Sequence, residues 1–563
     1  MRLAFDIEAN GLSEVTIEKK GVPTPEGDDI FCLCIQDVDT GEKHTFLRDE
    51  IETGVELLRE ADLIIGHSII MYDIPMLERY YGPIKTKTFD TLIVSRLMYP
   101  DRQDHPLGSN SLKAWGEYLN CPKQEFHDFS ELSEKMVEYC VQDVEVTTKV
   151  FHEEQEYFKR FPKSVKLEHK VARIISDQIV NGFGFDMTRA EEFEGDLLME
   201  KVGIEDELGQ IFLPYIDERY SDKTGKRLKD KITIFNPSSR KQIAERLHTK
   251  YGWNPPKTEK GNPKLDEAVL KKLPYYEAKK LVKYFTITKL LSQVEDWISR
   301  ANVSRDGRVH GSVNTQGTVT GRMTASQPNL QQVSSNSRAR ALFIPQKSWV
   351  QVGIDASGLE ARLLASRMAR WDKGDFAYQV LNEDIHEVNQ KAAGLPDRDS
   401  AKTFFYALIY GAGDFKIGQI VGGGPKKGRI IKQQYLDSMP ALKQLLANVE
   451  WQVHRKKTIT LLDGREVPCR AVHKALNVQI QGDGAILMKL GQVLFSRSLR
   501  PFKNQVKFMA TVHDEWQLEC DPVISDIIGT LGCQAIKKAG KILGCQIEMD
   551  GEFRVGNNWS ECH

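Results

Sequence analysis

The pattern of apolar and polar positions divides the chain into regions with different secondary structure. Apolar runs near the N-terminus predict a meander of three strands and a further short buried strand, in the segments LAFDIEANG (3–11), FCLCIQDV (31–38), TFL (45–47) and ADLIIGHS (61–68). Apolar residues at helical spacing occur between and after these strands, up to about residue 160. This mixture of strands and helices predicts an α/β or α+β domain that ends near residue 160.

Beyond residue 160 the pattern changes. Residues 163–300 are mostly helical in pattern, with long helices joined by two polar, basic loops, DERYSDKTGKRLKDK (217–231) and WNPPKTEKGNPK (253–264). After a turn-rich segment, the apolar run WVQVGID predicts a strand, residues 358–456 predict helices, and MATVHDEWQLEC predicts a strand, a turn and a strand. With 563 residues, three to four domains are expected.

Composition limits the class of protein. Hydrophobic residues make up 40% of the chain and charged residues 28%, which excludes a disordered or fibrous protein. No apolar stretch approaches the roughly 18 residues that span a bilayer, and the N-terminus is acidic where a signal peptide is apolar, so we expect a cytoplasmic protein. The nine cysteines form no C-x-x-C pair, and Cys32 and Cys34 lie in an apolar run typical of a core strand, so reduced thiols are expected.

Charge is distributed unevenly along the chain. Residues 1–160 contain 17 Lys and Arg against 32 Asp and Glu, a net charge of −15, whereas the remainder has a net charge of +13. A basic larger part is what binding to a polyanion such as nucleic acid requires. The alternative is that acidic and basic surfaces balance for solubility.

Acidic residues of the first domain have the spacing of a metal site. Asp6 and Glu8 lie on one face of the first predicted strand, because side chains two residues apart point the same way. Neighbouring carboxylates repel unless a cation lies between them, and they suit hard divalent ions. Asp73 follows the buried strand, and Tyr139 and Asp143 share one face of a helix. The alternative is that the four acids are structural.

In this order and these contexts, the five residues resemble the four-acid 3′–5′ exonucleases of the tyrosine-containing (DEDDy) subtype. The resemblance implies two metal ions about 4 Å apart, one that deprotonates the attacking water and one that stabilises the leaving 3′ oxygen. Asp6 would bridge the ions, and Glu8 and Asp143 would serve the side of the nucleophile. Asp73 would serve the other side, and Tyr139 would position the water.

Acids in the second half of the chain indicate another site. An apolar strand ends at Asp355, where a turn opens a helix, and such a position suits phosphate or metal. Asp514 and Glu515 lie between two apolar strand runs, which is typical of a hairpin with acids at its turn. Neither segment is decisive alone.

A helix between these acids combines cations with aromatics. Arg398, Lys402, Tyr406 and Tyr410 follow one another at intervals of four and form a stripe about 18 Å long. The cations occupy the N-terminal end, where the backbone also favours anions. A nucleoside triphosphate has the same polarity, with phosphates at one end and a stacking base at the other. The alternative is an amphipathic helix whose basic side chains reach into solvent.

Together, these three segments resemble motifs A, B and C of family A DNA polymerases, with motif B matching R-x3-K-x3-Y-x3-Y-G. The flanking stretches GTVTGRMTASQPNLQQV and HKALNVQIQGDGAILMK extend the resemblance, which is to the replicative polymerases of short-tailed, T-odd type bacteriophages and covers nearly the whole chain. It implies a ribonuclease H-like exonuclease domain followed by a right-hand polymerase domain. The implied ranges are exonuclease 1–160 and polymerase 161–563, with thumb about 185–300, palm about 301–375 and 441–563, and fingers about 376–440.

The resemblance also implies roles for residues. Asp355 and Asp514 would hold two magnesium ions, with the Ala356 carbonyl as a further ligand and Glu515 in support; the exonuclease site would hold two more, and Mn²⁺ can substitute. His386, Arg398 and Lys402 would bind the phosphates, and Lys402 would protonate the pyrophosphate. The remaining implied contacts are with the sugar (Glu360), the dNTP (Tyr406), the templating position (Tyr410), and primer or template (Arg322, Asn329, Gln332, His473, Asn477, Gln481 and His513).

The expected partners are a primed DNA template, dNTPs and a helicase–primase of the replisome. Phage relatives carry a long thumb insertion that captures host thioredoxin, whereas the interval from Leu208 to Lys231 is only about two dozen residues here, which argues against thioredoxin as a processivity factor. The basic loops of the thumb, or another factor, would then supply processivity. If the chain comes from a phage, its location is the cytoplasm of the infected bacterium.

Three other functions compete with this interpretation. A single-subunit RNA polymerase shares the palm carboxylates and the central Lys and Tyr-Gly, but Glu360 and the exonuclease acids argue against it. A nuclease whose remaining chain only binds nucleic acid is disfavoured by the intact Asp355, Lys402 and Asp514. Nothing in the sequence supports a structural scaffold of the replisome.

Overall fold

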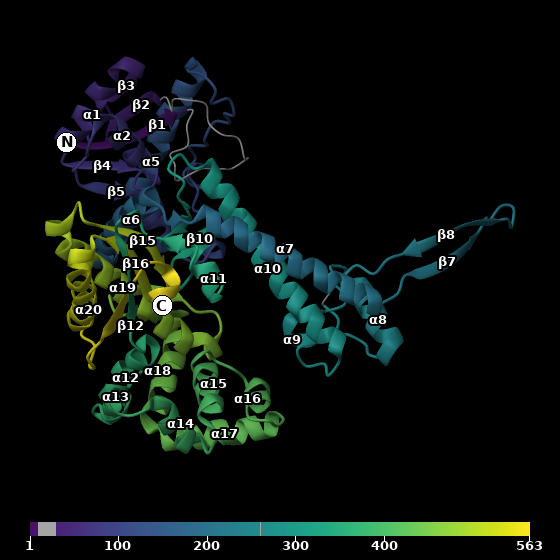
Figure 1. The fold of residues 1–563 in the computed structure, drawn as a ribbon. Helices are drawn as coiled ribbons and strands as arrows, with labels where there is room; N and C mark the ends of the chain where they lie inside the picture. Colours follow the sequence, from purple (N-terminus) through teal and green to yellow (C-terminus); the bar gives the residue numbers. More distant parts are fainter. Residues whose placement is uncertain (10–29, 259) are drawn as a thin grey trace. The chain divides into compact units, whose positions relative to one another are not determined.

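The computed structural model describes residues 1–9, 30–258 and 260–563 (Figure 1). The chain forms two compact units. The first contains Met1–Gly184, His310–Gln332 and Ile344–His563, and the second contains Phe185–Val309 and Val333–Phe343. The boundary expected near residue 160 falls inside the first unit, between two helices, and stays a prediction. No helix in the described ranges is long and apolar enough to cross a membrane.

A five-stranded mixed sheet forms the N-terminal part of the first unit, with the strand order β3-β2-β1-β4-β5. The first three strands are antiparallel and the last two run parallel to β1. The predicted meander and the buried strand are therefore confirmed, although Asn10 and Gly11 of the first predicted segment lie outside the described residues. The strands are β1 (Arg2–Ala9), β2 (Ile30–Asp37), β3 (Lys43–Leu47), β4 (Leu63–Gly66) and β5 (Thr88–Asp90).

Helices cover both faces of this sheet because successive side chains of β1 point alternately to one face and to the other. Leu3, Phe5 and Ile7 pack with α1 and α2 on one face, whereas Ala4 and the cysteines of β2 pack with α3 and α5 on the other. Asp6 and Glu8 share the face of Ala4, so they point toward α5. The helices are α1 (Ile51–Glu60), α2 (Asp73–Tyr81), α3 (Thr91–Met98), α4 (Leu112–Tyr118) and α5 (Glu134–Arg160).

Helix α6 (Pro162–Asn181) joins this sheet to the rest of the first unit. At one side, the backbone N–H of Asp90 donates to Nε2 of His169 at 2.7 Å. At the other, the fully buried Glu168 accepts from Arg465 and Lys489, each at 2.7 Å. Two cations compensate one buried carboxylate here, so removal of either would leave a buried charge less well paired.

The second sheet of the first unit has four antiparallel strands in the order β15-β16-β12-β17. Ile354 and Trp516 point into the core with the helices α19 (Ala475–Ser498) and α20 (Ser525–Ile542). The opposite face is polar and includes Gln351 and Gln517, which are hydrogen bonded at 2.6 Å. The strands are β12 (Val350–Ala356), β15 (Val506–Val512), β16 (Glu515–Cys520) and β17 (Gly551–Gly556).

The predicted helical middle of the chain is confirmed. Its helices, all labelled in Figure 1, follow one another in sequence between β12 and α19. Their bounds are α12 (Leu359–Asp372), α13 (Asp375–Asn382), α14 (Ile385–Ala393), α15 (Arg398–Ile409), α16 (Asp414–Ile420), α17 (Pro425–Ser438) and α18 (Pro440–Lys456).

The second unit is built on two long helices that pack together, α7 (Met187–Ile211) and α10 (Tyr276–Val303). The long helices are as predicted, but the polar segment expected to be a loop forms an antiparallel hairpin of β7 (Tyr215–Tyr220) and β8 (Arg227–Thr233). Because the hairpin is exposed on both faces, it lacks the apolar alternation by which a half-buried strand is recognised. The unit also contains α8 (Arg240–Tyr251) and α9 (Glu267–Leu270).

Short elements complete the two units. The short strands are β6 (Gly184–Phe185), β9 (Ser312–Asn314), β10 (Thr324–Ser326), β11 (Phe343–Ile344), β13 (Thr458–Thr460) and β14 (Glu466–Pro468). The short helices are α11 (Ser337–Arg340) and the 3-10 turns η2 (Arg48–Glu50), η3 (Arg102–Asp104), η4 (Leu330–Gln332), η5 (Val472–Lys474), η6 (Arg500–Phe502), η7 (Pro522–Ile524) and η8 (Trp559–Glu561).

Candidate functional site

The acids predicted for synthesis meet at one end of the four-stranded sheet. The register of β12 and β16 places Asp355 directly opposite Glu515. The backbone N–H of Ala356 donates to the carbonyl oxygen of Asp514 at 3.1 Å, so the β15–β16 turn adjoins the end of β12. His513 adopts a left-handed φ of 55° in this turn. Two segments far apart in sequence therefore bring Asp355 and Asp514 together.

The electrostatics of this end of the sheet favour a cation. Burial raises the pKa of Asp355 from 3.8 to about 7, and repulsion from Asp514, Glu515 and Glu552 adds to the effect. Glu552 was not singled out from the sequence, and it lies opposite Asp355 in β17. A divalent ion relieves such repulsion because it favours the charged form of every carboxylate around it.

Glu515 is held firmly from three sides. Its Oε1 accepts from Nε1 of Trp559 at 2.9 Å and from Gln517, and its Oε2 contacts Nδ1 of the C-terminal His563 at 3.0 Å. These partners were also missed in the sequence, because only the register of the sheet and the path of the C-terminus place them here. Glu515 is thus oriented by the protein, whereas Asp514 lies at the exposed turn.

Next to this acid pair lies a cavity of about 40 Å³ in the first unit. Arg322, His513 and Asp514 line it, so two of the residues predicted to contact DNA share a wall with a predicted metal ligand. Gln331 lines the cavity as well, although the sequence analysis singled out its neighbour Gln332. Asn329 accepts a hydrogen bond from the backbone N–H of Gln331 at 3.1 Å and thereby shapes the turn before η4.

Helix α15 carries the predicted stripe. It begins at Arg398 after Asp397, whose carboxylate accepts from the backbone N–H of Ser400 at 2.7 Å. Arg398 donates to Asp384 at 2.7 Å, and Lys402 is exposed. The helix ends at Ile409, so Tyr410 is its C-terminal cap and not part of its last turn.

The aromatic end of the stripe contacts its neighbours. The ring of Tyr406 lies 6.1 Å from His386 and 6.3 Å from Tyr410, measured between centroids. Asp384, the partner of Arg398, also accepts from the backbone N–H of His386 at 2.9 Å, so α14 and α15 are connected at this point. Burial raises the pKa of Tyr406, which stays protonated near neutral pH.

Glu360 connects residues for which the sequence predicted separate contacts. Its carboxylate accepts from the hydroxyl of Tyr410 at 2.9 Å and from Arg322 at 3.0 Å. Burial and the charge of Glu360 raise the pKa of Tyr410 to about 12. The predicted sugar, template and primer contacts thus belong to one hydrogen-bonded cluster of three side chains.

The packing of the backbone explains why a glycine follows the tyrosine in this motif. Gly411 has a φ of +76°, and a Cβ atom added to it would lie 2.0 Å from the carbonyl oxygen of His473. The end of α15 therefore rests directly on η5, from which α19 continues with Asn477 and Gln481. Both of these side chains are half-buried, and His473 is exposed.

The second group of acids lies under α5, on the N-terminal sheet. Asp6 and Glu8 come from β1, Asp73 is the first residue of α2, and Asp143 lies on α5. The backbone N–H of Ile7 donates to Asp73 at 3.2 Å, which ties α2 to β1 between the two strand acids. Glu8, Asp73 and Asp143 are all buried.

Burial raises the pKa of all four acids, and repulsion from neighbouring acids adds to the rise at Asp6, Glu8 and Asp73. Burial raises the pKa of Glu8 to about 8 and that of Asp73 to about 7, and in both cases the charge of Asp143 contributes. The pKa of Asp6 is raised well above its usual range by burial and by the other three acids. Burial also raises the pKa of Asp143. The group cannot be fully ionised without cations.

One cation in this site comes from the protein. Lys123 donates from Nζ to Asp143, and the same ammonium lies 4.3 Å from the centroid of the Tyr139 ring. The ring of Tyr139 is also bordered by Phe126 and Phe129, at 5.5 and 6.0 Å. Lys123 follows a proline in an irregular segment, and no pattern in the sequence marked it.

Comparisons with known proteins give this geometry a context. The sequence model of the family described as DNA polymerase family A matches residues 217–561. The chain is 30% identical to the DNA-directed DNA polymerases of Enterobacteria phage T3 and of Escherichia phage T7, over the full length of each chain. It is 25% identical to DNA polymerase I of Aquifex aeolicus, with 92% of each chain covered. The alignments with the two phage enzymes run over 717 positions, so those enzymes contain segments that these 563 residues lack.

A solved structure has the same fold. The POL domain of Pol1 from M. smegmatis, in complex with DNA primer-template and dNTP, matches all of this chain and 96% of its own with a TM-score of 0.80 at 17% identity. The fold is thus a right-hand polymerase preceded by an α/β domain. With the match of its sequence over most of its length, this chain belongs to DNA polymerase family A and is an enzyme of template-directed DNA synthesis.

Proposed function

We propose that the chain synthesises DNA at the acids of the four-stranded sheet and removes nucleotides from the 3′ end at the acids of the N-terminal sheet, as a replicative polymerase with proofreading. The observation that carries the second activity is the convergence of four carboxylates from β1, α2 and α5, three of them buried and Asp6 half-buried, each with a raised pKa. Structural acids are normally paired with as many cations or donors as they need, whereas Oδ1 of Asp143 is buried and has no hydrogen-bond partner among the described residues.

The donor atoms at the site of synthesis fit magnesium. Asp355, Asp514 and the Ala356 carbonyl would hold it, since carboxylate and carbonyl oxygens are hard ligands. When bound, the ions would activate the primer hydroxyl and neutralise the charge of the triphosphate. Glu515 would keep the sheet end negatively charged, because Trp559 and Gln517 fix its carboxylate beside Asp355.

The residues of α14 and α15 would bind the incoming nucleotide. Lys402 is exposed and would meet the phosphates, and its ammonium would supply a proton to the pyrophosphate. Arg398 would exchange its contact with Asp384 for a phosphate, since both side chains are partly exposed. Glu360 would border the sugar and exclude a 2′-hydroxyl, because Arg322 and Tyr410 hold its carboxylate in place.

In the proposed exonuclease site, residues of the chain would hold the metal ions and orient the attacking water. Asp6, Glu8, Asp73 and Asp143 would hold magnesium or manganese ions, which would supply an activated water and charge stabilisation for the leaving oxygen. Tyr139 would orient the water through its hydroxyl, with its ring fixed by Phe126 and Phe129. Lys123 would balance part of the negative charge when the ions are absent.

We propose primed DNA as the partner of the whole chain. Asn329, Gln332, His473, Asn477 and Gln481 would contact primer or template together with the cavity residues Arg322 and His513. Basic side chains of the second unit line a concave surface and would contact phosphates: Arg240, Lys241, Lys257, Lys260 and Lys264. Glu259, inside the same loop, lies outside the described residues.

The processivity factor belongs to the same proposal. The interval from Leu208 to Lys231 consists of the end of α7 and the β7–β8 hairpin, which leaves little chain for a long inserted segment. We therefore expect no dependence on thioredoxin, and a helicase–primase stays a candidate partner. Primer extension against an excess of trapping DNA, with and without thioredoxin, measures this directly; longer products with thioredoxin would contradict the expectation.

A pair of variants tests the two activities. Asp355→Ala should abolish primer extension and retain 3′ degradation, and Asp6→Ala should do the reverse, because each removes a carboxylate from only one group of acids. The loss is expected to reach at least about 100-fold, in the range of a lost charge-stabilising group. Both activities are measured on the same labelled primer-template, with and without dNTPs. A loss of both activities from Asp6→Ala in a folded protein would contradict the assignment.

A further inference from the structure

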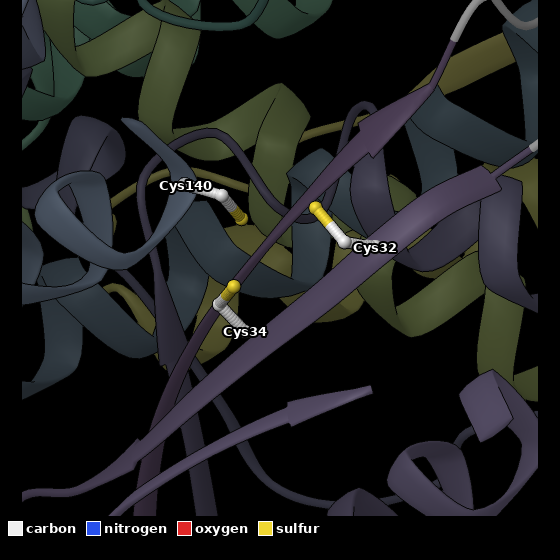
Figure 2. A group of neighbouring side chains, drawn as sticks. All are labelled: Cys32, Cys34 and Cys140. Atoms are coloured by element: carbon white, nitrogen blue, oxygen red, sulfur yellow. The ribbon is translucent and has the colours of Figure 1, made fainter. Parts of the chain in front are cut away.

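Three cysteines form a buried cluster beside the exonuclease acids. The Sγ atoms of Cys32, Cys34 and Cys140 all lie within 4.8 Å of one another, and Figure 2 shows them turned toward a common point. Their side chains are 0%, 2% and 0% exposed. All nine cysteines of the chain are described and free, and the other six belong to no such group within the described ranges.

The register of the sheet explains the cluster. Cys34 lies opposite Asp6 and Cys32 opposite Glu8 in the antiparallel pair of β1 and β2, so the two thiols and the two acids project from the same face. Helix α5 covers this face and adds Cys140. The thiols therefore form a second row of side chains, one strand away from the acids.

Cys140 lies close both to the other two thiols and to the acids of β1. Its Sγ lies 3.4 Å from the carbonyl oxygen of Asp6 and 3.9 Å from the carboxylate Oδ2 of Asp6. The ligand atoms of Asp6, Glu8 and Cys140 also lie within 4.8 Å of one another. Any movement of the Cys140 sulfur toward the other thiols would therefore disturb the packing around Asp6.

We propose that Cys32, Cys34 and Cys140 form a binding site for a thiophilic divalent ion such as Zn²⁺ or Cd²⁺, and that its occupation switches off removal of nucleotides at the neighbouring acids. Thiolates are soft ligands and carboxylates are hard ones, so the two rows select different ions. The switch rests on the exonuclease activity proposed above, whereas the binding of the ion does not.

The distances require only a small contraction. With Zn–S bonds of about 2.3 Å, the sulfur atoms of a tetrahedral site are about 3.8 Å apart, so separations of up to 4.8 Å must shrink by about 1 Å or less. Three sulfurs leave one position of the tetrahedron, for which the Asp6 carboxylate is a candidate because its Oδ2 lies 3.9 Å from the Sγ of Cys140. Each thiol that binds as a thiolate releases its proton to solvent.

Binding at this site would act on Asp6. If Asp6 becomes the fourth ligand, its carboxylate is no longer available to the magnesium ions between β1, α2 and α5. If it does not, the contraction of Cys140 toward β2 still changes the surroundings of the Asp6 backbone carbonyl. In both cases we expect slower 3′ degradation, and unchanged primer extension because Asp355 and Asp514 belong to another sheet.

Cadmium titration of the full chain tests the binding. The protein is reduced with a phosphine, and the ultraviolet charge-transfer absorption of cadmium–thiolate bonds is followed. We expect saturation at one ion per chain in the wild type and in the control Cys469→Ala, a buried cysteine outside the cluster. We expect loss of the band in Cys34→Ala and in Cys32→Ala. Primer extension verifies that each variant is folded. Two cluster variants are used so that the test remains valid if one of them does not fold.

The outcomes separate the parts of the proposal. No band in the wild type, or an equal band in the two cluster variants, overturns the metal site. With a cadmium-dependent band present, 3′ degradation in excess magnesium should fall at least ten-fold on addition of one equivalent of cadmium in the wild type, and stay unchanged in Cys34→Ala. Equal inhibition of both proteins overturns the switch, since cadmium then acts at the acids. If the wild type shows no 3′ degradation even without cadmium, the proposed exonuclease and the switch are wrong, and the binding site stands on its absorption band.

Discussion

At the scale of single residues, both groups of acids share one physical property. Asp355, Glu8 and Asp73 are wholly or partly buried near like charges, and burial is the main cause of their raised pKa values. A bound divalent ion stabilises the charged form of such carboxylates, and removal of the ion destabilises it. The stability of the ion-free protein should therefore depend on pH in a direction that the pKa values determine.

We expect the ion-free protein to lose stability as the pH rises. The pKa of Glu8 is raised from 4.5 to about 8, so between these values the folded protein holds a proton that the unfolded chain has lost. The free energy of unfolding then falls with rising pH over this window, by about 1–3 kcal/mol for Glu8 if its surroundings relax partly. Thermal unfolding in EDTA across this range measures the effect.

The matched variant for this experiment is Glu8→Gln, which is isosteric and does not titrate. Its midpoint should change less between low and high pH than that of the wild type, and magnesium should restore the wild type at high pH. An equal pH dependence in both proteins would contradict the raised pKa of Glu8 as its source.

Tyr406 gives a second prediction at this scale. Its hydroxyl takes part in no hydrogen bond that is resolved among the described residues, and its ring lies between His386 and Tyr410. The phenol can therefore replace a contact that a missing 3′-hydroxyl of the nucleotide would otherwise make. Tyr406→Phe should lower dideoxynucleotide use relative to dNTP at least about ten-fold, which corresponds to one lost hydrogen bond of about 1.4 kcal/mol.

The ratio of kcat/KM for a dideoxynucleotide and its dNTP measures this role of Tyr406. Tyr378→Phe is a suitable control, because Tyr378 is an exposed tyrosine of α13. If Tyr406→Phe leaves the ratio unchanged, the hydroxyl has no part in the selection of the sugar.

At the scale of elements, the packing of α15 against η5 depends on one glycine. Gly411→Ala would place a methyl group 2.0 Å from the carbonyl oxygen of His473 and would also strain a φ of +76°. The end of α15, with Tyr410, must then move. We expect a loss of at least about ten-fold in kcat/KM for dNTP, mainly through KM, and a destabilisation of about 1–3 kcal/mol.

Two residues further along, Gly413 offers the control for this variant. It has an ordinary φ of −73°, and a Cβ added to it would meet no atom within 4 Å. Gly413→Ala should therefore leave the KM for dNTP unchanged and lower the midpoint of unfolding by less than Gly411→Ala does, since Gly413 is the N-cap of α16 (Asp414–Ile420) and alanine is a poorer N-cap than glycine. Equal effects from the two substitutions would show that the contact with His473 is not the cause.

The elements also explain what could be predicted from the sequence. The strands of Asp6 and Asp355 were predicted because buried strands have strong apolar patterns. The hairpin of β7 and β8 was not, because both of its faces are exposed. Lys123, Glu552, Trp559 and Gln331 were missed because their positions depend on strand register and loop path, which no local pattern encodes. The cysteines of β2 were correctly expected in a strand core, but their proximity to Cys140 required the packing of α5.

At the scale of the whole molecule, the acidic and the basic part of the chain have different proposed functions. Residues 1–160 have a net charge of −15, and these include the four acids of the N-terminal sheet, of which Asp143 is paired with Lys123. The remaining chain is basic and contains the surfaces proposed to bind DNA. The net negative charge of residues 1–160 would disfavour paired DNA at the proposed exonuclease site, because paired DNA would be repelled and only an unpaired end would gain enough from the proposed metal ions.

The basic concave surface of the second unit gives the last prediction. Lys257 and Lys260 are exposed in a tight loop in which the backbone N–H of Thr258 donates to the carbonyl of Asn262 at 2.8 Å. The double substitution of these lysines by Gln removes two charges from this surface. If both contact phosphates, the slope of log affinity against log salt should become less steep by about 1.8, since each phosphate contact contributes about 0.9.

The control for this variant removes the same charge elsewhere. Lys538 and Lys541 are exposed on α20 of the first unit, and their substitution by Gln should leave the salt slope for primer-template unchanged. Fluorescence anisotropy with labelled primer-template at several salt concentrations gives both slopes. Equal slopes for the two variants would place the phosphate contacts of the chain outside this loop. A shallower slope for the Lys257 and Lys260 variant alone, together with shorter products against trapping DNA, would make the loop a determinant of processivity, because each lost contact increases the rate at which DNA dissociates between additions.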